Sequence, residues 1–276
     1  MNGLREPAVA GSFYPAKSDE IIGFIEKAMG LVEIKEDVSG AKAYVAPHAG
    51  YIYSGKTAAY AYKALSKKDD IEDIGTIVIV GPNHTGHGAP ISISVENWKT
   101  PLGIIENDIE LTNEIANAEG IAKDETAHQY EHSIEVHLPF IQHLFPGKKA
   151  CFICMGDQSI EAAVLLSNAI THSAKKLKRN ITVIGSSDFN HYEPASTASK
   201  KDGPLFEQLE KMDYKKFYEL KENSHESSCG YGPITVSLLY AKDHKARKGV
   251  LLSNTNSGDT NREYLSVVNY AAFTFV

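Results

Sequence analysis

The sequence has little cysteine, a single tryptophan and no long apolar run. Its three cysteines are too few for a disulfide framework, and their odd number suits a reducing compartment, so we expect a cytoplasmic protein. No segment approaches the roughly 20 apolar residues that a membrane span needs. The first residues also lack the charged and apolar regions of a secretory signal. We therefore expect no membrane association.

Basic residues are outnumbered, and several common catalytic motifs are missing. Lys and Arg total 28 against 35 Asp and Glu, which gives a net charge of −7. This balance provides no general attraction to nucleic acid, which we do not expect as a partner. The sequence has no phosphate-binding P-loop, no G-x-G-x-x-G after a strand and no G-x-S-x-G elbow. These absences argue against the commonest NTPases, dehydrogenases and esterases.

The composition is that of an ordinary globular protein, with 42% hydrophobic and 23% charged residues. No repeat, low-complexity tract or linker divides the chain, so we expect residues 1–276 to form one domain. Apolar, β-branched segments predict strands at 42–46, 75–81, 91–95, 150–155 and 181–186. Helices are predicted at 55–66, 107–118, 133–145 with an interruption at Pro139, 158–177, 204–222 and 233–242. The alternation predicts an α/β fold, in which helices flank both faces of a mostly parallel or mixed sheet.

Three polar loops that carry histidines directly follow predicted strands. They contribute His48, then His84 and His87, and finally His191. Ligands of open α/β sheets bind at the carboxyl ends of the strands, and imidazole is a common ligand of Fe, Zn and Cu. Each histidine alone is adequately explained as a strand-end cap. His48 and His84 follow strands that we expect to be neighbours, and together they predict a shared site. The assignment of His87 to this site is less clear.

Cys229 lies just before the helix predicted at 233–242. The amino end of a helix stabilises a thiolate, so Cys229 is a candidate nucleophile or soft metal ligand. The alternative is a small buried residue. Cys151 and Cys154 form a C-x-x-C pair, but residues three apart on a strand point to opposite faces. We therefore assign that pair to the core.

Asp188 and His191 are three residues apart in the loop after the strand at 181–186. A carboxylate beside an imidazole fixes its tautomer and raises its basicity, which makes His191 a candidate acid/base or further ligand. An equally good alternative is that Asp188 caps a turn and His191 is solvated.

The segment 131–140 is also dense in ionisable groups, including His132 and Glu135. Its spacing is not the H-E-x-x-H pattern of zinc proteases. Two interpretations stay open for these two residues. They support the neighbouring site indirectly, or they form an ion pair at the start of a helix.

Taken together, these segments resemble the MEMO family, named for a mediator of ErbB2-driven cell motility. The resemblance runs in order and at similar spacing from about residue 5 to the last strand. The motifs that carry it are AGSFYP at 10–15, APHAGY at 46–51, GPNH at 81–84, EHSIE at 131–135, SSDFNHY at 186–192 and CGYGPI at 229–234. It implies a fold similar to class III extradiol ring-cleavage dioxygenases, which hold non-haem Fe(II) with two histidines and a carboxylate.

By this resemblance, His48, His84 and Cys229 match the family's metal positions, with Asp188 and His191 beside them. Cys229 stands where the dioxygenases have a carboxylate, and Thr85 follows His84 where animal members have a second histidine. Two imidazoles and a thiolate suit Fe(II), Cu or Zn, and Fe(II) is the expected ion. The resemblance implies a metal-dependent, oxygenase-like redox protein that acts on an unidentified small molecule.

Two other functions stay open. One is a non-catalytic binding or signalling module that keeps an enzyme-like pocket, because eukaryotic members are implicated in binding phosphotyrosine peptides. The other is a zinc hydrolase that activates water at an open metal position. Some prokaryotic members occur beside, or fused to, AMMECR-type and radical-SAM proteins, which are candidate partners. Assembly into a homo-oligomer is also open.

Overall fold

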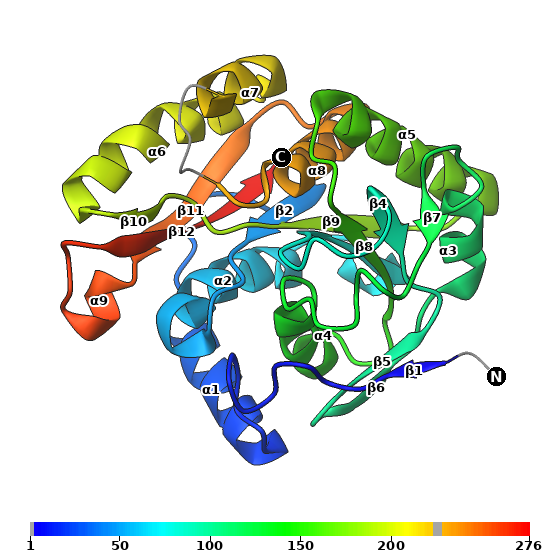
Figure 1. Ribbon diagram of the computed structural model, residues 1–276, viewed down its shortest axis with the longest axis horizontal. Helices are drawn as coiled ribbons and strands as arrows, with labels where there is room; N and C mark the ends of the chain where they lie inside the picture. Colours follow the sequence, from blue (N-terminus) through cyan, green and yellow to red (C-terminus); the bar gives the residue numbers. More distant parts are fainter. Residues whose placement is uncertain (1–2, 223–227) are drawn as a thin grey trace.

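The computed structural model describes residues 3–222 and 228–276 (Figure 1). Its strands are β1 (Leu4–Arg5), β2 (Ala43–Ala46), β3 (Thr76–Pro82), β4 (Ile91–Ile93), β5 (Asn97–Thr100), β6 (Gly103–Ile105), β7 (Ala122–Lys123), β8 (Lys149–Met155), β9 (Ile181–Ser186), β10 (His191–Glu193), β11 (Gly249–Asn256) and β12 (Val267–Phe275). In this part of the chain the main sheet has the order β10-β12-β2-β9-β3-β8-β4-β7, with β11 paired to β12. A small separate sheet has the order β1-β5-β6.

Helices cover both faces of the main sheet. They are α1 (Ser18–Gly30), α2 (Tyr51–Ser66), α3 (Ile109–Ile115), α4 (Leu138–Leu144), α5 (Ile160–Leu177), α6 (Ala195–Glu210), α7 (Tyr214–Glu222), α8 (Tyr231–Asp243) and α9 (Gly258–Asn261), with single 3-10 turns η1 (Ile71–Asp73) and η2 (Glu135–His137). In Figure 1, α5 to α8 lie above the sheet, and α1, α2 and α4 lie below it. None of the helices in the described residues is long and apolar enough to cross a membrane.

The centre of the main sheet consists of parallel strands that are buried on both faces. Strands β2, β9, β3 and β8 run parallel to one another, whereas β12 and β4 flank them in the antiparallel direction. Every residue of β3 is buried, which accounts for its continuous apolar sequence. Alternate residues of β3 join opposite cores, with Ile77 and Ile79 below the sheet and Val78 and Val80 above it.

The predicted α/β architecture is confirmed, and several local predictions can be compared with it. Cys151 and Cys154 lie on opposite faces of β8 in the two cores, as the strand periodicity predicts. Pro139 does not interrupt a helix, because it occupies the first turn of α4, where the missing N–H is not needed. Strands β2 and β3 are not neighbours as expected, because β9 lies between them.

Gly185 on β9 permits a close approach of α8 to the sheet. A Cβ atom at this position would lie 2.5 Å from the carbonyl oxygen of Pro233 in the first turn of α8. The same turn follows Cys229 directly, so this packing sets how near Cys229 comes to the ends of the central strands. Only glycine satisfies the spacing without moving the helix.

Replacing Gly185 by alanine is expected to lower the free energy of unfolding by about 1–3 kcal/mol, because α8 must shift away from β9. Urea unfolding measures the effect. Gly203→Ala in α6 is the matched control, since a Cβ there would meet nothing within 4 Å. The control should be neutral, or more stable by up to about 1 kcal/mol, because alanine is the better helix former. Equal stability of Gly185→Ala and the wild-type protein would contradict this account of the packing.

Candidate metal centre

The carboxyl ends of the central strands bring together the histidines of two loops. His48 follows β2 and His84 follows β3, and their ring centroids are 5.1 Å apart with the rings edge to face. His48 is buried, whereas the side chain of His84 is about one-third exposed. The two rings therefore meet across the end of β9, although their strands are separated by it.

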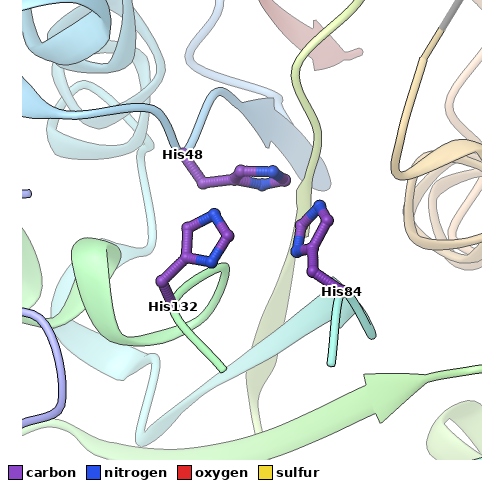
Figure 2. Close-up of side chains that lie close together, drawn as sticks. All are labelled: His48, His84 and His132. Carbon is purple, nitrogen blue, oxygen red and sulfur yellow. The ribbon is translucent and has the colours of Figure 1, made fainter. Parts of the chain in front are cut away.

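His132 completes a group of three imidazoles. One ring nitrogen from each of His48, His84 and His132 lies within 4.8 Å of the others (Figure 2). The three rings point toward one another from the ends of β2 and β3 and from the loop before η2. Nitrogen ligands at such separations can hold Fe, Cu or Zn. The sequence analysis did not assign His132 as a ligand, because no spacing motif marks it and its only signal is the density of ionisable groups around it.

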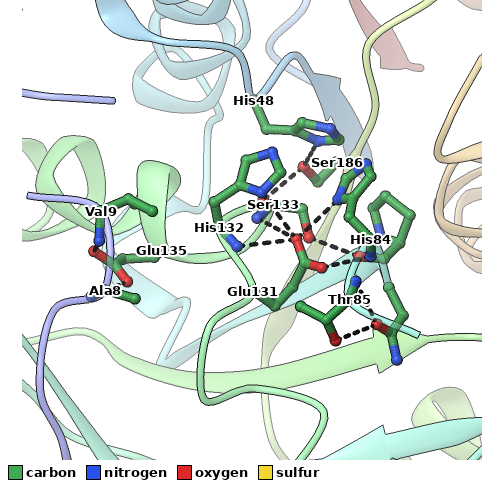
Figure 3. Close-up of polar contacts among 12 residues, drawn as sticks. Ala8, Val9, His48, His84, Thr85, Glu131, His132, Ser133, Glu135 and Ser186 are labelled. Carbon is green, nitrogen blue, oxygen red and sulfur yellow. Dashed lines mark hydrogen bonds and ion pairs between the residues drawn. The ribbon is translucent and has the colours of Figure 1, made fainter. Parts of the chain in front are cut away.

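Glu131 is a fully buried carboxylate that orients two of these histidines (Figure 3). Its Oε1 accepts a hydrogen bond from Nδ1 of His84 at 2.9 Å, and its Oε2 accepts one from the backbone N–H of His84 at 2.5 Å. Oε1 also accepts the backbone N–H groups of His132 and Ser133, both at 2.9 Å. Because Nδ1 of His84 donates, Nε2 carries the free lone pair that a metal requires.

The electrostatics of the group favour neutral imidazoles beside a charged carboxylate. Burial alone would raise the pKa of Glu131, but the hydrogen bonds from His84 and the backbone outweigh it and lower the pKa to about 2. Burial lowers the pKa of His132 to about 4 and holds that of His48 well below its usual value. Both rings are therefore neutral at physiological pH, which is the state that binds metals.

Cys229 adjoins the three-histidine group without being part of it. Its Sγ lies 3.2 Å from Nε2 of His48 and accepts the backbone N–H of Asp188 at 3.3 Å. Burial, and next the charge of Asp188, raise the pKa of the Cys229 thiol well above its usual value. The thiolate expected from the nearby helix start is thus not favoured in the protein alone, because desolvation outweighs the helix dipole.

Asp188 supports the backbone of the His48 loop. Its Oδ1 accepts the N–H of His48 at 2.9 Å, and the backbone of Ala49 also donates to the carboxylate. Burial raises the pKa of Asp188 to about 7 against these hydrogen bonds. Among the described residues, no hydrogen bond or ion pair joins Asp188 to His191, so the carboxylate does not fix the tautomer of this ring directly. His191 begins β10 half-buried, and its pKa is lowered by burial and by the neighbouring His84.

Glu135 ties the amino-terminal segment of the chain over the His132 loop. Its carboxylate forms a buried ion pair with Arg5 at 2.7 Å and accepts the Tyr14 hydroxyl at 2.7 Å. It also accepts two backbone N–H groups of the same segment, at 2.8 and 3.0 Å (Figure 3). The segment then places the ring of Phe13 4.5 Å from that of His132. Glu135 is the first residue of η2, so these contacts include the ion pair at a helix start that was one of its two interpretations. Its indirect support of the site stays a prediction.

The fold and the site define an α/β protein with a three-histidine group at the carboxyl ends of its parallel strands. A family model described as Memo-like protein matches residues 5–274, and the chain belongs to this family. A MEMO1 family protein of Methanosarcina barkeri is 42% identical over 275 residues, which cover 98% of each chain. One from Methanocaldococcus jannaschii is 43% identical over 286 residues, 99% of each chain. An uncharacterized protein of Escherichia coli overlaps with a TM-score of 0.48 at 12% identity, over 78% of this chain and 92% of that chain.

Exchanging Glu131 for glutamine is expected to lower the stability of the metal-free protein at neutral pH by about 3 kcal/mol, because the neutral amide loses the hydrogen bonds that depress the pKa. The folded pKa of about 2 lies below the ordinary value of 4.5, so the wild-type advantage is present above pH 4.5 and is lost as the pH falls toward 2. Urea unfolding across this range, with a chelator present, measures the difference.

The matched control is Glu207→Gln, which changes an exposed carboxylate paired with Lys211 and should shift stability by less than about 1 kcal/mol. A constant difference between Glu131→Gln and wild-type protein from neutral pH down to pH 2 would contradict the assignment of a charged, stabilising Glu131.

Proposed function

We propose that this chain is a metal-dependent redox protein, with the ion held by His48, His84 and His132 and with Cys229 as an adjoining ligand. The observation that carries the proposal is the convergence of three ring nitrogens within 4.8 Å, beside a thiol that lies 3.2 Å from His48. Imidazole and thiolate together suit Fe(II) first, with Cu and Zn as alternatives. When bound, Fe or Cu would supply one-electron and oxygen chemistry.

The surrounding side chains support this proposal. Glu131 holds His84 with its free lone pair on Nε2, and neutral rings are ready to bind without losing a proton. Cys229 is protonated in the protein alone, so its ligation requires a cation strong enough to displace the proton. His191, half-buried and within the electrostatic influence of His84, is the candidate to accept a proton from a small-molecule substrate.

A zinc hydrolase is the second candidate, and one observation favours it. A set of three imidazoles is a known zinc environment that leaves a position for water, and His132 supplies the third ring. The two functions differ in the ion they require. The identity of the native metal therefore separates them.

Protein purified without a tag under anaerobic conditions is expected to contain about one metal ion per chain, measured by mass spectrometry. His48→Ala and His132→Ala should each lose it, because a ligand is removed. His87→Ala is the matched control and should keep the metal, since His87 is an exposed histidine of the same loop as His84. Iron or copper directs the next assay to oxygen consumption with aromatic diols, and zinc directs it to ester and amide hydrolysis.

A wild-type protein without metal, even after reconstitution, would contradict the proposal. It would direct attention to a binding module and to a search for peptide or protein partners.

Cobalt substitution tests the role of Cys229 separately. The Co(II) protein is expected to show a near-ultraviolet absorption band from thiolate to metal, and Cys229→Ser should abolish it while Cys154→Ser leaves it unchanged. Cys154 is buried in the lower core, where the protein provides no neighbouring group of ligands among the described residues. A band that persists in Cys229→Ser would exclude Cys229 as a ligand.

A further inference from the structure

A buried hydrogen-bond network lies behind the three-histidine group. At its centre is the hydroxyl of Ser186, the last residue of β9, which contacts three groups. These are Nδ1 of His48 at 2.6 Å, Nε2 of His137 at 2.8 Å and the carbonyl oxygen of Ser133 at 2.7 Å. On its far side, Nδ1 of His137 lies 2.7 Å from the hydroxyl of Tyr62. All of these side chains are buried.

The number of hydrogens in the network determines which atom donates in each contact. The Ser186 hydroxyl has one hydrogen, and a carbonyl oxygen can only accept, so this hydrogen belongs to the bond with Ser133. The two imidazoles must then donate to the two lone pairs of the same hydroxyl. His137 therefore carries its hydrogen on Nε2, and its Nδ1 accepts from Tyr62.

The same accounting fixes the tautomer of His48. Its hydrogen lies on Nδ1, toward Ser186, and Nε2 is left with a free lone pair on the side of Cys229. If Ser186 donated to His48 instead, the hydrogen of His48 would move to Nε2 and the Ser133 carbonyl would lose this short bond. A buried carbonyl without its donor costs free energy, so the first arrangement is favoured.

The N–H of His137 occupies the second lone pair of Ser186, so the hydroxyl cannot donate its hydrogen to that ring. The choice between the carbonyl of Ser133 and the ring of His48 is then decided by the bond to Ser133. Tyr62 in turn holds His137 in the donating tautomer, because the phenol donates to Nδ1 at 2.7 Å. Both Tyr62 and His137 are fully buried, so the network leads into the core below the sheet and away from solvent. The network therefore fixes the position of a hydrogen atom. It does not form a path along which protons reach the surface.

We propose that Ser186 is a positioning residue for the metal centre: with its hydrogen donated to Ser133, it holds His48 in the tautomer that presents Nε2 to the ion. This inference rests on the proposed metal-binding function, but the tautomer itself can be measured without metal. Ser186 is not a ligand in this arrangement. It acts by keeping a proton off the atom that must bind.

The first measurement is a long-range proton–nitrogen NMR spectrum of the histidine rings in metal-free protein at neutral pH. We expect His48 to be in the Nδ1–H form in the wild-type protein. In Ser186→Ala, signals of the Nε2–H form should appear, whereas His137→Phe should keep the Nδ1–H form because the bond from Ser186 to Ser133 remains. Ser186→Thr keeps the hydroxyl and should restore the wild-type pattern.

The second measurement is the affinity for zinc, determined by competition with a chelator. Loss of a group that orients a ligand typically lowers affinity 10- to 100-fold, and we expect roughly this loss for Ser186→Ala. Ser186→Thr is the matched control and should keep the wild-type affinity, because it retains the hydroxyl.

The outcomes separate the two proposals. Zinc binding by the wild-type protein with unchanged affinity and tautomer in Ser186→Ala would overturn the role of Ser186 and leave the metal centre intact. A wild-type protein that binds no metal would overturn the proposed function. In that case the NMR spectra of the metal-free variants still decide whether Ser186 controls the tautomer. Ser186→Ala removes a single oxygen, so the test does not depend on the folding of the more severe His137→Phe.

Discussion

The Glu131 carboxylate is the interaction on which the candidate site depends. It is excluded from solvent, yet it stays ionised because backbone N–H groups and the His84 ring surround it with donors. A buried charge is costly unless it is fully hydrogen-bonded, and this one folds the loop at 131–134 around itself. His132 is brought to the metal-binding group by that loop. The same oxygens fix the orientation of His84, so one carboxylate arranges two of the three rings.

Part of this arrangement follows from residue order alone. The alternation of apolar strands and helices predicts the α/β fold, and His48 and His84 are predicted to meet because each directly follows a parallel strand. The position of His132 could not be predicted in the same way, since it depends on contacts with Glu131 and with an amino-terminal segment more than 120 residues away. The order of the strands could not be predicted either, because the pattern of strands and helices does not indicate that β9 lies between β2 and β3.

Burial outweighs the helix start in setting the protonation of the Cys229 thiol. The packing of α8 against β9 at Gly185 holds the half-buried Cys229 beside His48 and Asp188, where desolvation raises the pKa of the thiol although a helix begins nearby. Its role as a metal ligand stays a prediction. The neutral thiol, the neutral imidazoles and the Ser186 network together give a site with little charge of its own beyond the carboxylates that support it. Such a site favours a cation, because the cation balances the negative charge of Glu131 and the neutral imidazoles bind it without losing a proton.

The position of β9 between β2 and β3 also determines when the site can form. The strands that carry His48 and His84 are made early in synthesis, but the strand that separates them begins at residue 181. A nascent chain that ends before this residue cannot place the two histidines at their final separation. If it pairs β2 with β3 directly, that pairing has to break before β9 can enter. The candidate metal centre is therefore a product of the nearly complete chain, assembled from contacts of high sequence separation that form late in folding.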